Sequence, residues 1–484
     1  MPGSELSNPI EDHPYRAAIL PPLGCHRDQA GWKHRLIERT RLTEATLRGS
    51  GAAEGNDNYP RRSYAWYVLA VLIGTAIVSY TDRQVLSLLV DPLRRDLGIT
   101  DTQVSLLLGT AFAVVYGLAG IPFGLLADRT SRRNLIFFGV IVWSAGTVAC
   151  GYAHTFEQLF AARIVVGLGE SVLSPAAISL ISDYFPPARR GFAVGCFLSG
   201  IAIGIGSSIL IGGGVLHVVE TGMLAGTSIG ALAPWRLVLL LIGVPGLAWA
   251  LLILTIREPV RRAAEPKIAD SAAGASGVRI TTRWVIPIYI VVATASLVDN
   301  AVGAWSPTLL IRTFGRDPAA VGLQLGFVLT IGFGGGVLLG GWLSDKVGLR
   351  GGWPYKLGVC LAASALIMPV AAAINSGNFA VVMTSVPLYF ALSGVVTACG
   401  FSSILDAVPN RRRGFAMAVS FFLNVALGAG VGPSSVALAS AHIFGEAAGL
   451  GPAIASVVAS GYAIAALAIV LTLAGLKHRS MRPR

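Results

Sequence analysis

Residues 124–133 read Gly-Leu-Leu-Ala-Asp-Arg-Thr-Ser-Arg-Arg, and residues 341–346 read Gly-Trp-Leu-Ser-Asp-Lys, 217 residues further on. Three other matched pairs repeat at intervals of 217 or 223 residues: Asp82 with Asp299, Leu108-Gly109 with Leu325-Gly326, and Arg190-Gly-Phe-Ala193 with Arg413-Gly-Phe-Ala416. One match alone means little, but four in register predict that a single structural unit occurs twice in the chain, in the same orientation.

The composition is that of a membrane protein. Only 13% of the 484 residues are charged and 54% are hydrophobic, whereas soluble domains carry about 25% charged residues. A soluble protein of this length needs far more polar surface to cover its core. The net charge of +12 falls in short clusters between apolar runs, which argues against a nucleic-acid partner. The five cysteines lack metal-ligand spacing, so we expect no metal and no disulfide.

Twelve apolar windows follow the polar N-terminal region, each long enough to cross about 30 Å of hydrocarbon. We place them near 65–90, 102–126, 134–153, 157–184, 190–216, 234–256, 285–312, 319–345, 356–376, 378–405, 412–440 and 448–476. The sequence therefore predicts an all-α membrane protein of twelve transmembrane helices. Its two six-helix halves are expected to be related by a parallel repeat.

The segments between the windows predict five regions. Residues 1–64 are polar and lack the apolar core of a signal peptide, which fits either a disordered cytoplasmic tail or a start codon assigned too early. Residues 65–256 form the first half, 257–284 a polar linker, 285–476 the second half and 477–484 a basic tail. The N-terminal tail alone holds nine Lys and Arg, whereas the loops on the opposite side hold four, Arg94, Arg95, Arg312 and Arg316. The positive-inside rule therefore places both termini in the cytoplasm.

Four charged residues fall inside the first-half helices. Asp82 and Arg83 lie in the first window, and Arg163 and Glu170 lie seven residues apart in the fourth, on one helix face. Each charge inside a membrane costs roughly 2.5–3.5 kcal/mol, so the four must pair or meet water. One interpretation is a purely structural ion-pair lock. The other is that Arg83 or Arg163 holds an anionic substrate group while Asp82 or Glu170 exchanges a proton.

The repeated segment at 124–133 is expected to act as a gate. Gly124 allows close packing, and Asp128, Arg129 and Arg132 lie at the cytoplasmic end of the second helix, within reach of acidic groups such as Asp183. The second-half copy contributes Asp345. These charges suit a latch that breaks when the halves rock. The alternative is a solvated basic turn that only satisfies the positive-inside rule.

A second group of residues is expected to line a central cavity and contact substrate. Asp299 and Asn300 are the second-half counterparts of Asp82 and Arg83, so an Asn replaces the Arg and the halves are asymmetric. The other candidates are Tyr80, Tyr116, Trp305 and Asn424. Aromatic residues on membrane helices also serve in packing, which is the alternative for each. No sequence pattern of a hydrolase, zinc protease or nucleotide-binding loop occurs, so we expect no enzyme activity and no cofactor.

The motif Gly124-x-x-x-Asp128-Arg129-x-x-Arg132-Arg133 resembles the loop between helices 2 and 3 of the major facilitator superfamily. Tyr80-Thr-Asp82-Arg83, Gly167-Leu-Gly169-Glu170-Ser171 and Leu180-Ile-Ser-Asp183-Tyr-Phe-Pro-Pro187 resemble the bacterial spinster-like transporters. The resemblance covers residues 65–476 and implies the major facilitator fold in a bacterial inner membrane. It also implies transport of lysolipids or sphingoid lipids, with proton coupling at Asp82 and Glu170. Symporters of sugar acids share a similar helix-1 Tyr-x-Asp-Arg and helix-4 Arg/Glu pair.

These features predict a secondary active transporter that works by alternating access. Its drive would be the proton gradient, and its substrate an amphipathic lipid-like or organic anion. A symporter of small organic anions such as sugar acids is the first alternative. A membrane receptor of transporter fold that binds without turnover is the second. The expected partners are the substrate, protons and the lipid bilayer, and the protein is expected to be a monomer.

Overall fold

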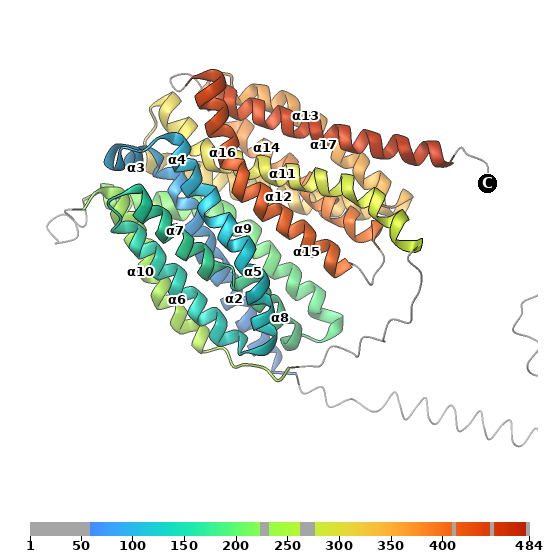
Figure 1. Ribbon diagram of the computed structural model, residues 1–484, viewed down its shortest axis with the longest axis horizontal. Helices are drawn as coiled ribbons and strands as arrows, with labels where there is room; N and C mark the ends of the chain where they lie inside the picture. Colours follow the sequence, from blue (N-terminus) through green and yellow to red (C-terminus); the bar gives the residue numbers. More distant parts are fainter. Residues whose placement is uncertain (1–58, 223–231, 262–275, 409–412, 446–449, 481–484) are drawn as a thin grey trace, which may run out of the picture. The chain divides into compact units, whose positions relative to one another are not determined.

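The computed structural model describes residues 59–222, 232–261, 276–408, 413–445 and 450–480. Apart from short connections, the described chain is helical, and it forms two groups of helices joined by the linker (Figure 1). The first group holds α2 Arg62–Gln84, η1 Val85–Leu88, α3 Val90–Leu97, α4 Asp101–Ser105, η2 Leu106–Thr110, α5 Ala111–Arg129, α6 Arg132–Gly151, α7 Phe156–Glu170, α8 Leu173–Tyr184, α9 Pro187–Glu220 and α10 Pro234–Leu254.

The second group follows the same plan. It holds α11 Ser276–Phe314, α12 Pro318–Gly351, α13 Trp353–Ile374, α14 Phe379–Ala407, α15 Arg413–Leu423, η4 Asn424–Ala429, α16 Gly430–Ala439, η5 Ser440–Phe444 and α17 Leu450–Ser480. Within the described ranges, eleven helical segments are long and apolar enough to cross a membrane. These eleven segments correspond to all of the predicted spans except the fifth. The fifth predicted span lies in α9, a helix of 34 residues that is not among the eleven. The predicted all-α architecture of two six-helix halves is confirmed.

Local sequence explains where several helices begin. Thr100 caps α4 through its hydroxyl, and Gln103 bonds back to the Thr100 backbone, which is a complete capping box. Ser131 caps α6, and Thr155 caps α7, each by accepting a backbone N–H three residues on. These caps fix the connections at both ends of the first half.

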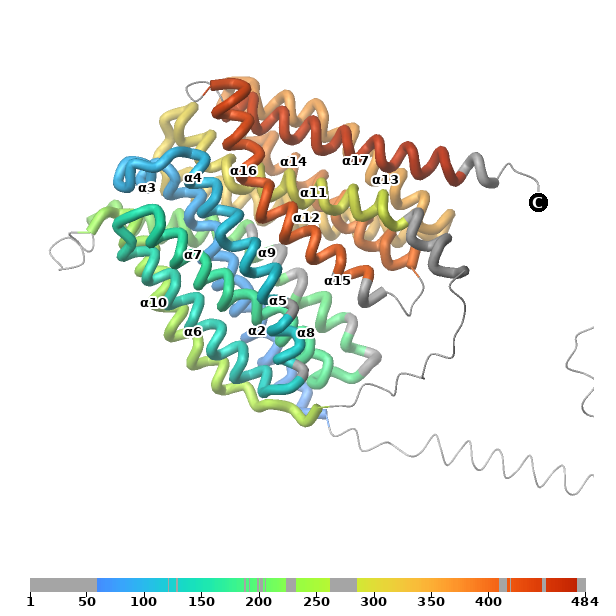
Figure 2. The backbone as a smooth tube through the Cα atoms, in the orientation of Figure 1, coloured from blue at the N-terminus to red at the C-terminus, as the bar shows by residue number. Residues whose placement is uncertain are grey.

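The two ends of the helical bundle differ, and we name them by what they contain. The linker end holds the α5–α6 turn and residues 257–261, which follow α10. The distal end holds α3, α4 and the last turn of α11. Near the distal end α9 packs against α12 (Figure 2). The contact is backbone to backbone, because a Cβ on Gly213 would lie 2.7 Å from the Gly322 Cα.

A second contact between the halves joins two irregular segments. Gly109 lies in η2 so close to η4 that a Cβ there would be 2.2 Å from the Ala429 carbonyl oxygen. Thr110 donates its hydroxyl hydrogen to the Gly430 carbonyl at 2.9 Å. Both η2 and η4 are π-helical, a local widening of the helix that occurs frequently at functional sites.

Candidate functional site

The four intramembrane charges of the first half lie together. Arg83, near the end of α2, donates from Nη2 to Glu170 Oε2 at 2.6 Å. Glu170 is the last residue of α7, and its side chain is fully buried, whereas 15% of the Arg83 side chain is exposed. The guanidinium therefore reaches open space while its carboxylate partner does not.

Three aromatic rings surround the Arg83 guanidinium. Its central carbon lies 4.0 Å from the Phe112 ring centre, 4.6 Å from that of Tyr80 and 5.3 Å from that of Tyr116. Contacts of this kind contribute about 0.5–2 kcal/mol each by cation–π attraction. They fix the plane of the guanidinium, whose Nε is buried and has no hydrogen-bond partner among the described residues. Arg83 is bonded to Glu170 through Nη2 and also lines the cavity between the halves.

Asp82 and Arg163 form a second, fully buried layer. Arg163 donates from Nε to the Leu107 carbonyl at 3.3 Å and from Nη1 to the Asp82 backbone carbonyl at 3.4 Å. In the part of the chain that the structure describes, neither carboxylate oxygen of Asp82 has a hydrogen-bond partner, and neither does Arg163 Nη2. Asp82 is 1% exposed. A buried charged group without partners is costly, so this carboxylate is the least satisfied polar side chain of the site.

A cavity of about 120 Å³ lies between the two halves. The first half contributes Tyr80, Arg83 and Gln84, and the second contributes Asp299 and Asn300 from α11. The cavity wall also includes Asn424 of η4 and apolar residues of α9, α12 and α14. Five of the predicted substrate-contact residues therefore share one cavity: Tyr80, Arg83, Asp299, Asn300 and Asn424.

A larger, almost wholly apolar chamber of about 630 Å³ lies toward the linker end. It is bordered by α5, α8 and α9 of the first half and by α15 of the second. Tyr116 lines this chamber and also faces Arg83. Its hydroxyl lies 3.4 Å from that of Ser174, another chamber residue. The charged site and the apolar chamber therefore meet at Tyr116.

Trp305 lies outside the cavity, in contrast to the expectation from sequence. Its side chain is 0% exposed, and its indole N–H donates to the Pro433 carbonyl at 2.8 Å. It packs α11 against α16. The indole nitrogen needs a partner when buried, and the Pro433 carbonyl, inside α16, supplies one.

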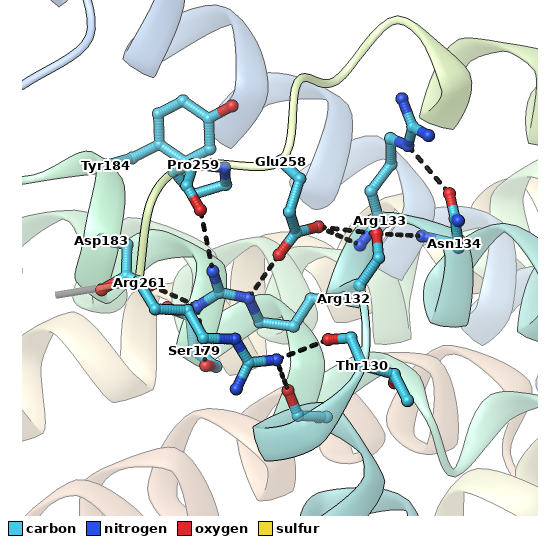
Figure 3. Close-up of polar contacts among 12 residues, drawn as sticks. Thr130, Arg132, Arg133, Asn134, Ser179, Asp183, Tyr184, Glu258, Pro259 and Arg261 are labelled. Carbon is cyan, nitrogen blue, oxygen red and sulfur yellow. Dashed lines mark hydrogen bonds and ion pairs between the residues drawn. The ribbon is translucent and has the colours of Figure 1, made fainter. Parts of the chain in front are cut away.

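The predicted gate at the linker end is built around Arg132 (Figure 3). Arg132 forms an ion pair with Asp183 at the end of α8 and donates from Nη1 to the Ser179 hydroxyl at 3.1 Å. Glu258, just after α10, accepts from Arg132 Nε at 2.8 Å and from the Arg133 N–H at 2.9 Å. Every one of these contacts lies within the first half. Among the described residues the network does not reach the second half.

The other predicted gate residues lie around this network. Gly124 lines the apolar chamber, and Arg129 is exposed near the end of α5. Asp128 lies in α5 between them, but its side chain is outside the described part of the chain. Asp345 is exposed on α12 and makes no ion pair or hydrogen bond with another described residue. The structure thus joins Arg132 and Asp183 and leaves Arg129 and Asp345 apart from them.

The second half contains a copy of the Arg132 cluster that sequence reasoning missed. Lys356, at the start of α13, donates from Nζ to Asp406 at 2.6 Å and to the Ser402 hydroxyl at 2.7 Å. Ser179 and Asp183 precede Ser402 and Asp406 by the 223-residue interval found in the sequence. The Ser-x-x-x-Asp spacing that both halves share could have revealed this second cluster. A motif of two residues is too common in sequences to be noticed before the fold is known.

A charge network between the halves at the distal end was also missed. Arg312, in the last turn of α11, donates from Nε to Asp91 at 2.7 Å. It also donates from Nη1 and Nη2 to the two oxygens of Asp101, at 2.7 and 2.8 Å. Arg94 forms a further ion pair with Asp101 at 3.2 Å. We call Asp91, Arg94, Asp101 and Arg312 the distal latch. In the sequence these residues look like ordinary loop charges.

Two six-helix halves that enclose a charged cavity, latched at one end and separated by a chamber at the other, define a membrane transporter. The model of the Major Facilitator Superfamily matches residues 72–433. The chain therefore belongs to this superfamily, as its motifs predicted, and is a multi-pass membrane transporter rather than an enzyme.

Relatives and solved structures agree with this assignment. An MFS-type efflux pump of Mycolicibacterium smegmatis is 28% identical over 87% of this chain and 94% of the pump. A probable L-galactonate transporter of Escherichia coli is 26% identical over 63% of this chain and 68% of that protein. The crystal structure of a bacterial homologue of the human lysosomal transporter Spinster, inward-facing and occupied, superimposes with a TM-score of 0.71. It is 25% identical and covers 86% of this chain and 96% of that one. The resemblance to the spinster-like family is confirmed.

Proposed function

We propose that the protein is a proton-coupled secondary active transporter of amphipathic organic anions, working as a monomer in a bacterial inner membrane. The observation that carries this proposal is the position of Arg83. One face of its side chain is held by Glu170, and the other opens into the cavity between the halves, next to Tyr116 and the apolar chamber.

Arg83 supplies the anion-binding group. A guanidinium presents several donors in a rigid fork that matches carboxylate or phosphate geometry. Here the fork is oriented by the three aromatic rings, and the Arg83 side chain lines the cavity. An anionic head group entering the cavity would bind Arg83 in competition with the Glu170 carboxylate, whose second oxygen has no hydrogen-bond partner.

This competition provides the proton coupling. When the substrate anion takes the guanidinium, Glu170 loses its cation in a buried position and is stabilised by binding a proton. When the substrate leaves, the ion pair forms again and the proton is released. The buried layer of Asp82 and Arg163 lies directly behind and is the second candidate for proton exchange. Substrate and proton would therefore move as one coupled unit.

The apolar chamber favours an amphipathic substrate. A head group at Arg83 would place its apolar part past Tyr116 and into the 630 Å³ chamber. Burial of apolar surface in such a chamber contributes about 25 cal/mol per Å², whereas a small sugar acid would leave it empty. The chamber lies at the linker end, which the positive-inside rule assigns to the cytoplasm. With the distal latch closed, the site is accessible from the cytoplasm.

A symporter of small organic anions is the second candidate, favoured by a specific relative. The similar E. coli protein is a probable L-galactonate transporter. The central cavity of about 120 Å³ has amide groups at Gln84, Asn300 and Asn424 that suit the hydroxyls of a sugar acid. The same four charges would then bind and couple a substrate that never enters the chamber.

The test uses purified protein in liposomes that contain a pH dye. Lysophosphatidic acid and galactonate are added separately, with Glu170→Gln and empty liposomes as controls. A pH change with lysophosphatidic acid alone supports the amphipathic substrate, and one with galactonate alone supports the sugar-acid symporter. Glu170→Gln should carry fewer protons per substrate and so give a smaller pH change, while the protein still folds and is incorporated into the liposomes. A wild-type response in Glu170→Gln removes Glu170 from coupling.

A further inference from the structure

The second half contains its own carboxylate at the central cavity. Asp299 occupies the repeat position of Asp82, but its surroundings are different. Asp82 is 1% exposed and absent from the cavity wall, whereas Asp299 is partly exposed and lines it. In this conformation Asp299, and not Asp82, has access to the space in which substrate binds.

Only neutral groups bind the Asp299 carboxylate. Its Oδ1 accepts hydrogen bonds from the Tyr389 hydroxyl at 2.7 Å and from the Ser393 hydroxyl at 2.5 Å, both on α14. Among the described residues Asp299 forms no ion pair. A charged carboxylate in a membrane is normally paired with a cation. Because Asp299 has no such cation in the described part of the chain, binding a proton is the way in which its charge can be neutralised.

A third hydroxyl lies beside this group. Tyr462 of α17 is 0% exposed, its ring centre is 6.1 Å from that of Tyr389, and its hydroxyl lies beside those of Tyr389 and Ser393. A buried hydroxyl needs a neighbouring hydrogen-bonding group of this kind. A buried polar patch therefore lies behind Asp299, formed by the hydroxyls of Tyr389, Ser393 and Tyr462. Of these four residues, Asp299 is the one that lines the cavity.

The charges around Asp299 set the effect of a substrate anion. The titratable or charged groups from neighbouring elements are Tyr80 and Arg83 of α2 across the cavity, Tyr389 of α14, Tyr462 of α17 and, beyond Tyr462, Cys360 of α13. Arg83 is already paired with Glu170. An anion bound at Arg83 would share the small cavity with Asp299, and two negative charges there repel each other.

We propose that Asp299 is a second proton-binding site, in the second half, whose protonation permits the anion to bind. This rests on the proposed function, since the anion is its substrate. Because binding energies are reciprocal, a proton on Asp299 tightens anion binding and a bound anion tightens proton binding. An O–H bond forms on the carboxylate as one O–H bond breaks in a hydronium ion of the cavity water, which becomes a water molecule. Each half then contributes one proton-binding acid, Glu170 and Asp299.

The first test needs no substrate. Infrared difference spectra of the full-length protein in liposomes are recorded between about pH 8 and about pH 5, a range in which a buried carboxyl group is free to titrate. We expect a carboxylic-acid C=O band that is lost in Asp299→Asn and present in Glu157→Gln, which changes an exposed carboxylate on α7. Tyr389→Phe should shift the frequency of the band, since that hydroxyl donates to the carboxyl group. A band unchanged in both Asp299→Asn and Tyr389→Phe overturns the proposal.

The second test separates this proposal from the proposed function. Transport of lysophosphatidic acid is measured with its accompanying protons, and Asp299→Asn should carry about half as many protons per substrate. Its substrate binding should also lose the part of its pH dependence that comes from Asp299 and keep the part that comes from Glu170, since Asn imitates the neutral acid. An unchanged ratio with an unchanged pH profile contradicts the proposal. If the wild type transports no probe, the proposed function fails, and the infrared result still decides whether Asp299 binds a proton.

Discussion

Arg312 of the second half binds both carboxylate oxygens of Asp101 in the first half, through Nη1 at 2.7 Å and Nη2 at 2.8 Å. A two-bond Arg–carboxylate pair is among the stronger polar contacts in proteins. The two residues are 211 positions apart in the sequence, and their contact crosses the boundary along which the halves must separate. Opening the distal end therefore requires these bonds to break.

Arg312→Gln should favour the state in which the distal end is open. Losing the fork removes contacts made only in the closed state, so we expect a shift of about 1–3 kcal/mol, or about 5–150-fold in population. Spin labels at exposed Arg95 and Thr313 report the distance across this end. The control is Arg316→Gln, because Arg316 is exposed and only stacks on Phe379. An unchanged distance distribution in Arg312→Gln would show that the latch does not hold the halves.

The glycine contact between α9 and α12 offers a matched pair of variants. A Cβ on Gly213 would lie 2.7 Å from the Gly322 Cα, whereas a Cβ on Gly214 would lie 3.9 Å from Leu323 Cδ2. Gly213→Ala should cost about 1–3 kcal/mol in the latched state through overpacking and should lower the transport rate. Gly214→Ala should behave as wild type. Equal transport rates and equal thermal unfolding for the two variants would contradict the close backbone contact.

Glu258 should make the stability of the linker end depend on pH. Burial disfavours the charged Glu258 carboxylate, but hydrogen bonds from the Arg133 N–H, Arg132 and Ser131 outweigh it and lower its pKa below the usual 4.5. A lowered folded-state pKa gives stability that is present above the unfolded pKa and is lost as the pH falls through the folded one.

Glu258→Gln should therefore lower the thermal unfolding temperature at pH 7, with a cost of about 1–3 kcal/mol for the lost charged acceptor. The difference from wild type should shrink as the pH falls through the lowered pKa of Glu258. Calorimetry of the detergent-solubilised proteins across that range measures it. A constant difference at every pH would mean that the ionised carboxylate does not stabilise the turn.

Filling the apolar chamber should discriminate between substrates. A side chain on Gly120 would meet no atom within 4 Å at its Cβ, and Gly120 lines the chamber. Gly120→Trp should raise the half-saturation of lysophosphatidic acid at least about tenfold, about 1.4 kcal/mol, and leave galactonate unaffected. The control is Gly195→Trp, at an equally open position on α9 outside the chamber wall. Wild-type affinity for lysophosphatidic acid in Gly120→Trp would place the tail elsewhere.

Arg83→Lys should separate charge from geometry at the anion site. Lysine keeps the positive charge but loses the planar fork, so it cannot hold Glu170 and an anion in two directions at once. We expect the half-saturation to rise about tenfold in Arg83→Lys and further in Arg83→Ala, as measured by substrate titration of transport. Equal half-saturation in Arg83→Ala and wild type would remove Arg83 from the binding site.

Much of this fold follows from one-dimensional patterns. Apolar windows of about 20 residues located the spans, since a membrane leaves few other ways to satisfy the backbone. The repeat and the spacing of Arg163 and Glu170 located the charged site. Trp305 could not be placed from sequence, because an aromatic residue on a helix looks the same whether it faces a cavity or a neighbouring helix. The distal latch could not be found because Arg312 and its acidic partners are joined only by the closure of the two halves.

The two Ser–Asp clusters at the linker end have diverged in their basic residue, Arg132 in one half and Lys356 in the other. The two basic residues also differ in whether a described chain segment that follows the last helix of their half lies beside them. Only the first half is continued by a linker, and the guanidinium of Arg132 has a free edge for its Glu258. The Lys356 ammonium is a compact point charge that binds Asp406 and Ser402 with two of its three donors. The two clusters thus share a Ser–Asp pair but differ in what their cation holds: the guanidinium of Arg132 also fixes the segment after α10 to the turn between α5 and α6, whereas Lys356, among the described residues, joins only α13 to α14.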